Sequence, residues 1–195
     1  KWLGQRALTF TENKGQVTDS RGALRPDILF TATNNGVGLF FQRNVVSYVY
    51  PKVEQVGGEA TVTGVYRSDV EFIGANPNVE ILAQEQAPGV SNFYLGANDI
   101  TNVRSFSKVV YKNLYANIDL VYYAAGNGAQ MKYDFIVHPG GNVADIQMRY
   151  IATSKLQVTR EGSLLAQNNY GRSIEDAPYT YQTLNGVEKA VTTSY

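Results

Sequence analysis

The sequence predicts an all-β protein: an antiparallel β-sandwich of about eleven to thirteen strands, with almost no helix. Apolar and polar residues alternate along most segments with the period of two that a half-buried strand requires. Turn residues, chiefly Gly, Asn and Pro, recur at roughly 8–12-residue spacing, which is typical of sandwiches and barrels. The best helix signal is a single turn over residues 142–146, where Asn142 is placed to cap and Asp145 lies in the first turn.

The N-terminal half contains regular strand and turn signals. Residues 37–41 and 45–50 form a predicted hairpin around a turn at 42–44. Pro51 is expected to end the second strand, because it has no N–H to donate to a neighbouring strand. A loop is predicted at Gly57 and Gly58. Further strands are predicted over 60–73, 79–84, 91–95 and 105–111, with a turn over 74–78.

The C-terminal part continues the same alternation. Strands are predicted over 155–159, 163–167, 179–184 and 187–194, separated by Glu-Gly and Asn-Gly turns. No linker-like run divides the chain and no internal repeat is clear, so we take residues 1–195 as a single β-sandwich domain. Residues 191–195 still have the character of a strand, and we therefore expect the domain to be truncated before its last strand or strands.

Composition narrows the classes of function. Charged residues make up 17% of the chain and there are 14 Tyr, a balance that suits exposed β-sheet in an extracellular protein. Seventeen basic and seventeen acidic residues cancel, which argues against a nucleic-acid partner, because such proteins need a basic patch. The absence of Cys excludes disulfides, thiolate nucleophiles and zinc–cysteine sites. No apolar run approaches the roughly 20 residues of a membrane-spanning helix.

The central segment, residues 111–150, predicts a β meander. Its turn at Asn127-Gly128 is a strong hairpin signal, because both central residues of a type I′ turn need a positive φ. This turn sets the register of the two flanking strands, and a slip by one residue would turn the apolar face outward. The predicted core face consists of the pairs Tyr122–Tyr133, Leu120–Phe135 and Ile118–Val137.

The other face of this hairpin carries the candidate ligand-binding residues Asp119, Tyr123, Lys132 and Asp134. Asp119 and Asp134 are predicted diagonal neighbours at about 7–8 Å, within the roughly 5–10 Å range of a glycosidase carboxylate pair. The alternative is an ion-paired sheet face in which Lys132 neutralises Asp134. Asp119 would then hydrogen-bond the backbone of a neighbouring loop. We assign no catalytic residue.

Other sites are weakly signalled. His138 is the only histidine, it precedes Pro139 at a strand end, and no Gly-x-Ser-x-Gly elbow accompanies it, so we expect a surface residue. No metal or cofactor is predicted, although a structural calcium ion stays open because oxygen ligands are abundant in turn-like segments. The candidate calcium ligands are Asn13, Asp19, Asn98, Asp99 and Asn102. Asx turns explain the presence of these residues equally well.

Aromatic side chains offer a further type of site. Exposed rings in a sheet can stack on sugars, although most Tyr residues in sheet proteins are half-buried packing residues. The candidates are Tyr48, Tyr50, Tyr66, Phe93, Tyr94, Tyr122, Tyr123, Tyr179 and Tyr181.

Six stretches together resemble an uncharacterised all-β domain near the N-terminus of large exported bacterial proteins. Those proteins often carry SBBP-type propeller repeats, Ig-like or PKD modules, or a gliding-motility-type C-terminal sorting domain. One departure is Ala116, where members of the family usually have Pro. The matching stretches are FTENKGQ (10–16), VEFIGANPN (70–78), NFYLG (92–96), YKNLYANIDLVYY (111–123), MKYDFIVHPGG (131–141) and EDAPYTYQ (175–182).

The resemblance implies an exported protein, secreted or at the cell surface, in a bacterium that uses the type IX route. Because residues 1–4 are not followed by an apolar stretch, we expect that any export signal has been removed. The resemblance supplies no catalytic residues. We therefore predict a non-enzymatic module for adhesion, assembly or domain presentation. Its partners would be other domains of the same polypeptide or cell-surface proteins, and glycans stay open. The alternatives are a carbohydrate-binding module and a glycan-active hydrolase or lyase that uses Asp119 and Asp134.

Overall fold

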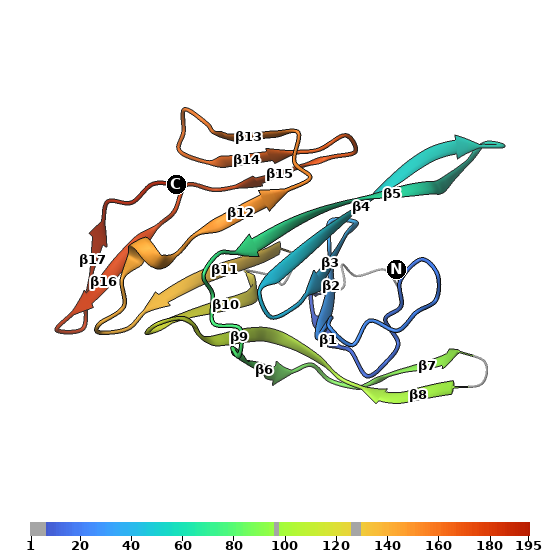
Figure 1. The fold of residues 1–195 in the computed structure, drawn as a ribbon, viewed down its shortest axis with the longest axis horizontal. Helices are drawn as coiled ribbons and strands as arrows, with labels where there is room; N and C mark the ends of the chain where they lie inside the picture. The colour runs from blue at the N-terminus through green and yellow to red at the C-terminus, as the bar shows by residue number, and fades with distance from the viewer. Residues whose placement is uncertain (1–6, 96–97, 126–129) are drawn as a thin grey trace. The chain divides into compact units, whose positions relative to one another are not determined.

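The computed structural model describes residues 7–95, 98–125 and 130–195 (Figure 1). The contacts of the chain group into two compact units. The first unit comprises Lys1–Val49 and Asp69–Arg149, and the second comprises Tyr50–Ser68 and Tyr150–Tyr195. The described residues form antiparallel strands with a single 3-10 turn, which confirms the predicted all-β class and is consistent with a sandwich-like fold. The prediction of one domain over residues 1–195 stays a prediction.

Seventeen strands occur in the described residues, more than the sequence predicts. The strands that the sequence does not predict are β1, β2, β8 and β15, which are three to six residues long and offer few alternations to recognise. They are β1 (Phe10–Glu12), β2 (Phe30–Asn34), β3 (Val37–Phe41), β4 (Val45–Val56), β5 (Glu59–Phe72), β6 (Glu80–Gln86), β7 (Ser91–Leu95), β8 (Asn98–Val103), β9 (Ser105–Tyr115), β10 (Ile118–Ala125), β11 (Gln130–Val137), β12 (Met148–Ile151), β13 (Lys155–Val158), β14 (Leu164–Gln167), β15 (Arg172–Glu175), β16 (Thr180–Leu184) and β17 (Val187–Val191).

The largest sheet has the strand order β11-β10-β9-β1-β2-β3-β4-β5-β12, with β6 paired to β9. Its chain path is not sequential, because β1 pairs with β9 through Phe10 and Phe106. β7 and β8 form a separate two-stranded ribbon. The 3-10 turn η1 (Val143–Asp145) follows β11, and the side chain of Asn142 accepts a hydrogen bond from the Ala144 N–H, as the capping signal predicts.

The core of the first unit is built from aromatic and aliphatic side chains of β1, β3, β9 and β10. Phe41 is fully buried and lies edge-on to both Phe10 and Tyr122, with ring centroids 5.3 and 5.1 Å apart. Tyr111 is also fully buried, and its hydroxyl donates to the Gln42 carbonyl at 2.9 Å. Burial raises the pKa of Tyr111 far above its ordinary value, so this hydroxyl remains a donor.

The register of β10 and β11 is the predicted one: Tyr122 pairs with Tyr133, and Leu120 with Phe135. The Asn127-Gly128 turn itself lies outside the described residues. The predicted core face holds on β10, where Leu120 is fully buried, but Val137 on β11 is 40% exposed. The reason is that β11 ends the strand order, so its residues have a neighbouring strand on one side only.

The prediction that Pro51 ends its strand is wrong, because β4 continues to Val56. β3 accompanies β4 only as far as the Gly38–Val49 pair. Pro51 therefore lies beyond that ladder, at a position where the missing N–H breaks no hydrogen bond to β3. The next turn is the Gly57-Gly58 pair, and both glycines have a positive φ, 62° and 89°.

The second unit contains the three-stranded sheet β13-β14-β15 and the two-stranded ribbon β16–β17 (Figure 1). Its buried apolar side chains are few: Leu164, Ala166 and Tyr50. The Tyr50 ring lies against Gly171, where an added Cβ would come within 2.8 Å of a ring carbon. Buried Asn168 accepts from two backbone N–H groups and donates to the Ser68 hydroxyl at 3.1 Å, so this small core is closed partly by hydrogen bonds.

Candidate functional site

Asp119 is the centre of the best-defined polar cluster in the first unit. It lies in β10, immediately after the tight turn between β9 and β10, where Asn117 has a φ of 58°. The pairing of β9 with β10 shifts its register between Ile118 and Leu120, which is the position of Asp119. Only 4% of the Asp119 side chain is exposed. A carboxylate so deeply buried requires partners.

Three donors from two other segments surround this carboxylate. The Nζ atom of Lys112, in β9, forms an ion pair with Asp119 Oδ2, and His138 Nε2, just after β11, lies 2.9 Å from the same oxygen. The backbone N–H of Asn113 donates to Oδ1 at 2.8 Å. Asp119 therefore ties β9, β10 and the end of β11 together through one carboxylate.

The pKa of Asp119 is the result of two opposing effects. Burial raises it, because the charged form loses hydration. The hydrogen bonds from Lys112, Asn113 and His138 outweigh burial and hold the pKa below its ordinary value. Asp119 is therefore ionised at neutral pH, with both oxygens engaged by donors.

The other predicted ligand-binding residues do not join this cluster. Asp134 is exposed and pairs with Val121, so it is the diagonal neighbour of Asp119 that the register predicts. Lys132 is exposed and Tyr123 is half-buried. Among the residues that the structure describes, no ion pair joins Lys132 to Asp134. The predicted carboxylate pair thus has one buried, fully engaged member and one exposed member, which is a poor arrangement for acid–base catalysis on a shared substrate.

Sequence reasoning missed the two side chains that hold Asp119. His138 was expected at the surface, and 43% of its side chain is indeed exposed, but its ring also contacts Asp119. Lys112 lies in a different strand, and the register shift between β9 and β10 determines which residue of β9 meets Asp119. No local pattern predicts this pairing. The only signal in the sequence for this cluster is an Asp close to a predicted strand end, together with the single His of the chain at the end of the next strand.

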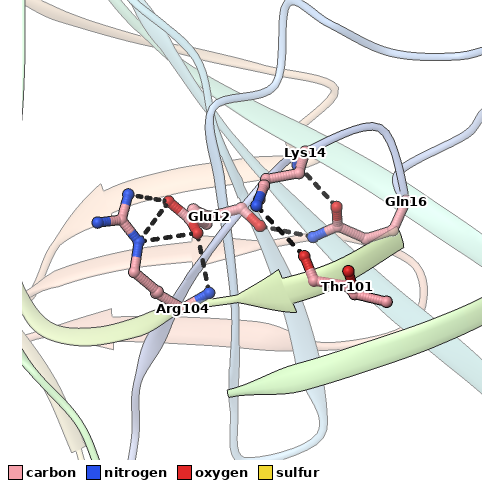
Figure 2. Close-up of polar contacts among 5 residues, drawn as sticks. All are labelled: Glu12, Lys14, Gln16, Thr101 and Arg104. Atoms are coloured by element: carbon pink, nitrogen blue, oxygen red, sulfur yellow. Dashed lines mark hydrogen bonds and ion pairs between the residues drawn. The ribbon is translucent and has the colours of Figure 1, made fainter. Parts of the chain in front are cut away.

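A second polar cluster joins the N-terminal segment to β8 and β9 (Figure 2). Glu12 accepts three hydrogen bonds from the guanidinium of Arg104 and one from its backbone N–H. Gln16 Nε2 donates to the Glu12 carbonyl at 2.5 Å, and Lys14 Nζ donates to the Thr101 carbonyl at 3.2 Å. The hydrogen bond from Arg104 holds the pKa of Glu12 below its ordinary value. The FTENKGQ stretch is therefore bonded to β8 through Thr101 and to Arg104, the residue between β8 and β9.

Two of the candidate calcium ligands, Asn13 and Asp19, take the alternative role that the sequence left open. Asn13 Oδ1 accepts from the Gly15 N–H, and Asn13 Nδ2 donates to the carbonyls of Arg25 and Ile28. Asp19 Oδ1 accepts from two backbone N–H groups. Both are Asx-type turn residues. In the described parts of the chain, no three acidic or His side chains are grouped to hold a metal ion.

The aromatic candidates for sugar stacking fall into three groups. Four are half-buried: Tyr48, Tyr66, Phe93 and Tyr123. Tyr122 and Tyr50 are buried and cannot present a ring face. Tyr94, Tyr179 and Tyr181 are 72%, 74% and 49% exposed. The rings of Tyr179 and Tyr181 are in contact, with centroids 5.7 Å apart and planes inclined at 38°.

The described residues form an all-β fold in which a deeply buried carboxylate joins strands and exposed tyrosines lie on or beside two separate two-stranded ribbons. Residues 10–195 match the model of a domain of unknown function, DUF7948, and the chain therefore belongs to this family. Neither the curated proteins nor the solved structures contain a match to the chain. None of the described residues forms a helix that is long and apolar enough to span a membrane.

Proposed function

We propose that this chain is a non-enzymatic interaction module of an exported, multidomain surface protein, acting in adhesion, assembly or domain presentation. The observation that carries the proposal is the hairpin tip of β4 and β5, residues 53–63, which we call the arm. Every residue of the arm is exposed, including Val53, Val56 and Val62 at 55%, 54% and 60%. The surface setting is proposed from the sequence resemblance alone.

The arm has the properties of a contact element for another polypeptide. A two-stranded hairpin is marginally stable in water on its own, and exposed β-branched residues add apolar surface with nothing to cover it. One of the two carboxylates of the arm is already compensated, because Glu54 forms an ion pair with Lys52 at 2.6 Å. An extended segment with apolar side chains, added along one edge of the arm, would hydrogen-bond to the open edge and cover the valine side chains.

The Asp119 cluster supports a non-enzymatic role. Both carboxylate oxygens receive donors within the chain, so a substrate would have to displace Lys112 or His138 to reach them. If Asp119 stabilises the pairing of strands, all these contacts serve that role. Catalysis would instead require some of these hydrogen bonds to break.

The test is photo-crosslinking on intact cells that express the full-length polypeptide. Benzoylphenylalanine replaces Val56 or Val62 in the arm, and Val143 serves as the matched control, because it is 59% exposed in the first unit. We expect both arm positions to crosslink to the same polypeptide segment, identified by mass spectrometry, and Val53→Lys to abolish the product. No discrete product at either arm position, or an equal product at Val143, contradicts the proposal. Digestion of the polypeptide by protease added outside the intact cells measures whether it lies on the cell surface.

A further inference from the structure

The β16–β17 ribbon carries an exposed aromatic pair on a face of unusual composition. In the register of the ribbon, Tyr181 pairs with Ala190 and Thr183 pairs with Glu188. Side chains alternate between the two faces of a strand, so these four residues share one face. Tyr179 precedes Tyr181 by two residues, and the contact of the two rings places it on the same face. We call this surface the tyrosine face.

The tyrosine face is open. Tyr179 and Tyr181 are 74% and 49% exposed, and Thr183, Glu188 and Ala190 are all exposed as well. The residue opposite Tyr181 is Ala190, which is too small to cover the ring. For comparison, the Tyr66–Tyr170 pair in the same unit meets edge to face at 87°, a packing geometry. The planes of Tyr179 and Tyr181 are inclined at only 38°, so these two rings are closer to parallel than to edge-to-face.

The opposite face of the ribbon has a different chemistry. By the same alternation, Leu184, Val187 and Val191 lie there, together with Gln182 and Lys189. The aliphatic side chains of the ribbon are therefore separated from the tyrosines. Beside the two rings, the tyrosine face carries the carboxylate of Glu188, the hydroxyl of Thr183 and the methyl group of Ala190.

From this arrangement we propose that the tyrosine face binds carbohydrate, specifically an extended, β-linked glycan chain. A pyranose presents a flat C–H face, which stacks on an aromatic ring, and a rim of hydroxyls, which donate to acceptors such as Glu188. The 5.7 Å between ring centroids is comparable with the length of one sugar unit. A β-linked chain is extended like the strand, so consecutive units meet Tyr179 and Tyr181 in turn. This surface is separate in sequence and role from the arm, and the inference goes beyond the proposed function.

The experiment measures binding of the whole chain to β-linked and α-linked hexasaccharides of glucose and of N-acetylglucosamine, by titration calorimetry. The variants are Tyr179→Ala and Tyr181→Ala. Tyr94→Ala is the matched control, because Tyr94 is 72% exposed but lies in β7, outside the β16–β17 ribbon. Tyr181→Phe keeps the ring. Circular dichroism and melting temperature verify that each variant folds.

We expect at least one β-linked hexasaccharide to bind, with affinity reduced about tenfold or more in each of the two ribbon variants. Tyr94→Ala and Tyr181→Phe should bind as the unchanged chain does, and the α-linked probes should bind more weakly. The inference is overturned if no hexasaccharide binds, if the ribbon variants bind normally, or if Tyr94→Ala loses binding equally. Crosslinking from the arm is unaffected by Tyr181→Ala, so failure of this inference and failure of the interaction role are distinguishable.

Discussion

The two units of the chain bury apolar surface very differently. Among the described residues, all but three of the buried apolar side chains belong to the first unit. The second unit holds about a third of the residues, yet most of the large apolar side chains that are exposed lie in it. Hydrophobic burial is the main favourable contribution to folding. The first unit therefore has its own source of stability, whereas the second exposes the strand surfaces that we propose as contact surfaces.

The largest effect should come from a cavity in the first unit. Leu120→Ala removes a fully buried side chain, and we expect a loss of about 2–5 kcal/mol in the free energy of unfolding. The counterpart in the second unit is Val62→Ala, where the side chain is 60% exposed and a change within about 0.5 kcal/mol is expected. Urea denaturation measures both. Similar losses in the two variants would remove the distinction between the units.

An intermediate effect should come from the buried carboxylate. Asp119→Asn keeps the shape of the side chain but removes the charge beside Lys112 and His138, and we expect a loss of about 1–3 kcal/mol. Lys112 is 37% exposed, so solvent screening keeps the loss below that of a fully buried pair. Asp134→Asn is the control, with a change within about 0.5 kcal/mol. If Asp134→Asn instead abolished turnover of a glycan substrate, the chain would be an enzyme after all.

The smallest effect is the pH dependence of this difference. The pKa of Asp119 is lower in the folded chain than its ordinary value, so its contribution is present above the unfolded pKa of about 4 and is lost as pH falls through the folded pKa. The melting temperatures of the unchanged chain and of Asp119→Asn should therefore begin to converge as pH falls below about 4. A gap that stays constant from neutral pH to about pH 2 would show that the charge of Asp119 contributes nothing.

Much of the local structure could be predicted from short patterns. The alternation on either side of the Asn127-Gly128 pair predicts the register of β10 and β11 correctly, and Asn142 caps its 3-10 turn as expected. Asn13 and Asp19 form the turns that their residue types favour. These features depend on residues that are near one another in the sequence, so short sequence patterns are enough to predict them.

The candidate site was predicted less completely. Asp119 was recognised as a residue of interest, but its partners Lys112 and His138 were not, because they are brought to it by the pairing of strands and a shift of register. The extension of β4 past Pro51 has the same origin. Whether a missing N–H matters depends on which strand lies beside it.

Local alternation and turn chemistry thus account for the strands, their hairpins and the all-β class, since each depends on residues close in sequence. Burial does not follow from them. Val121 and Val62 both occupy alternating β segments, yet Val121 is 8% exposed and Val62 is 60% exposed. A period of two distinguishes two faces of a strand but does not say which face is covered, because covering requires strands distant in sequence. That long-range pairing buried Asp119 and left the arm and the tyrosine face open.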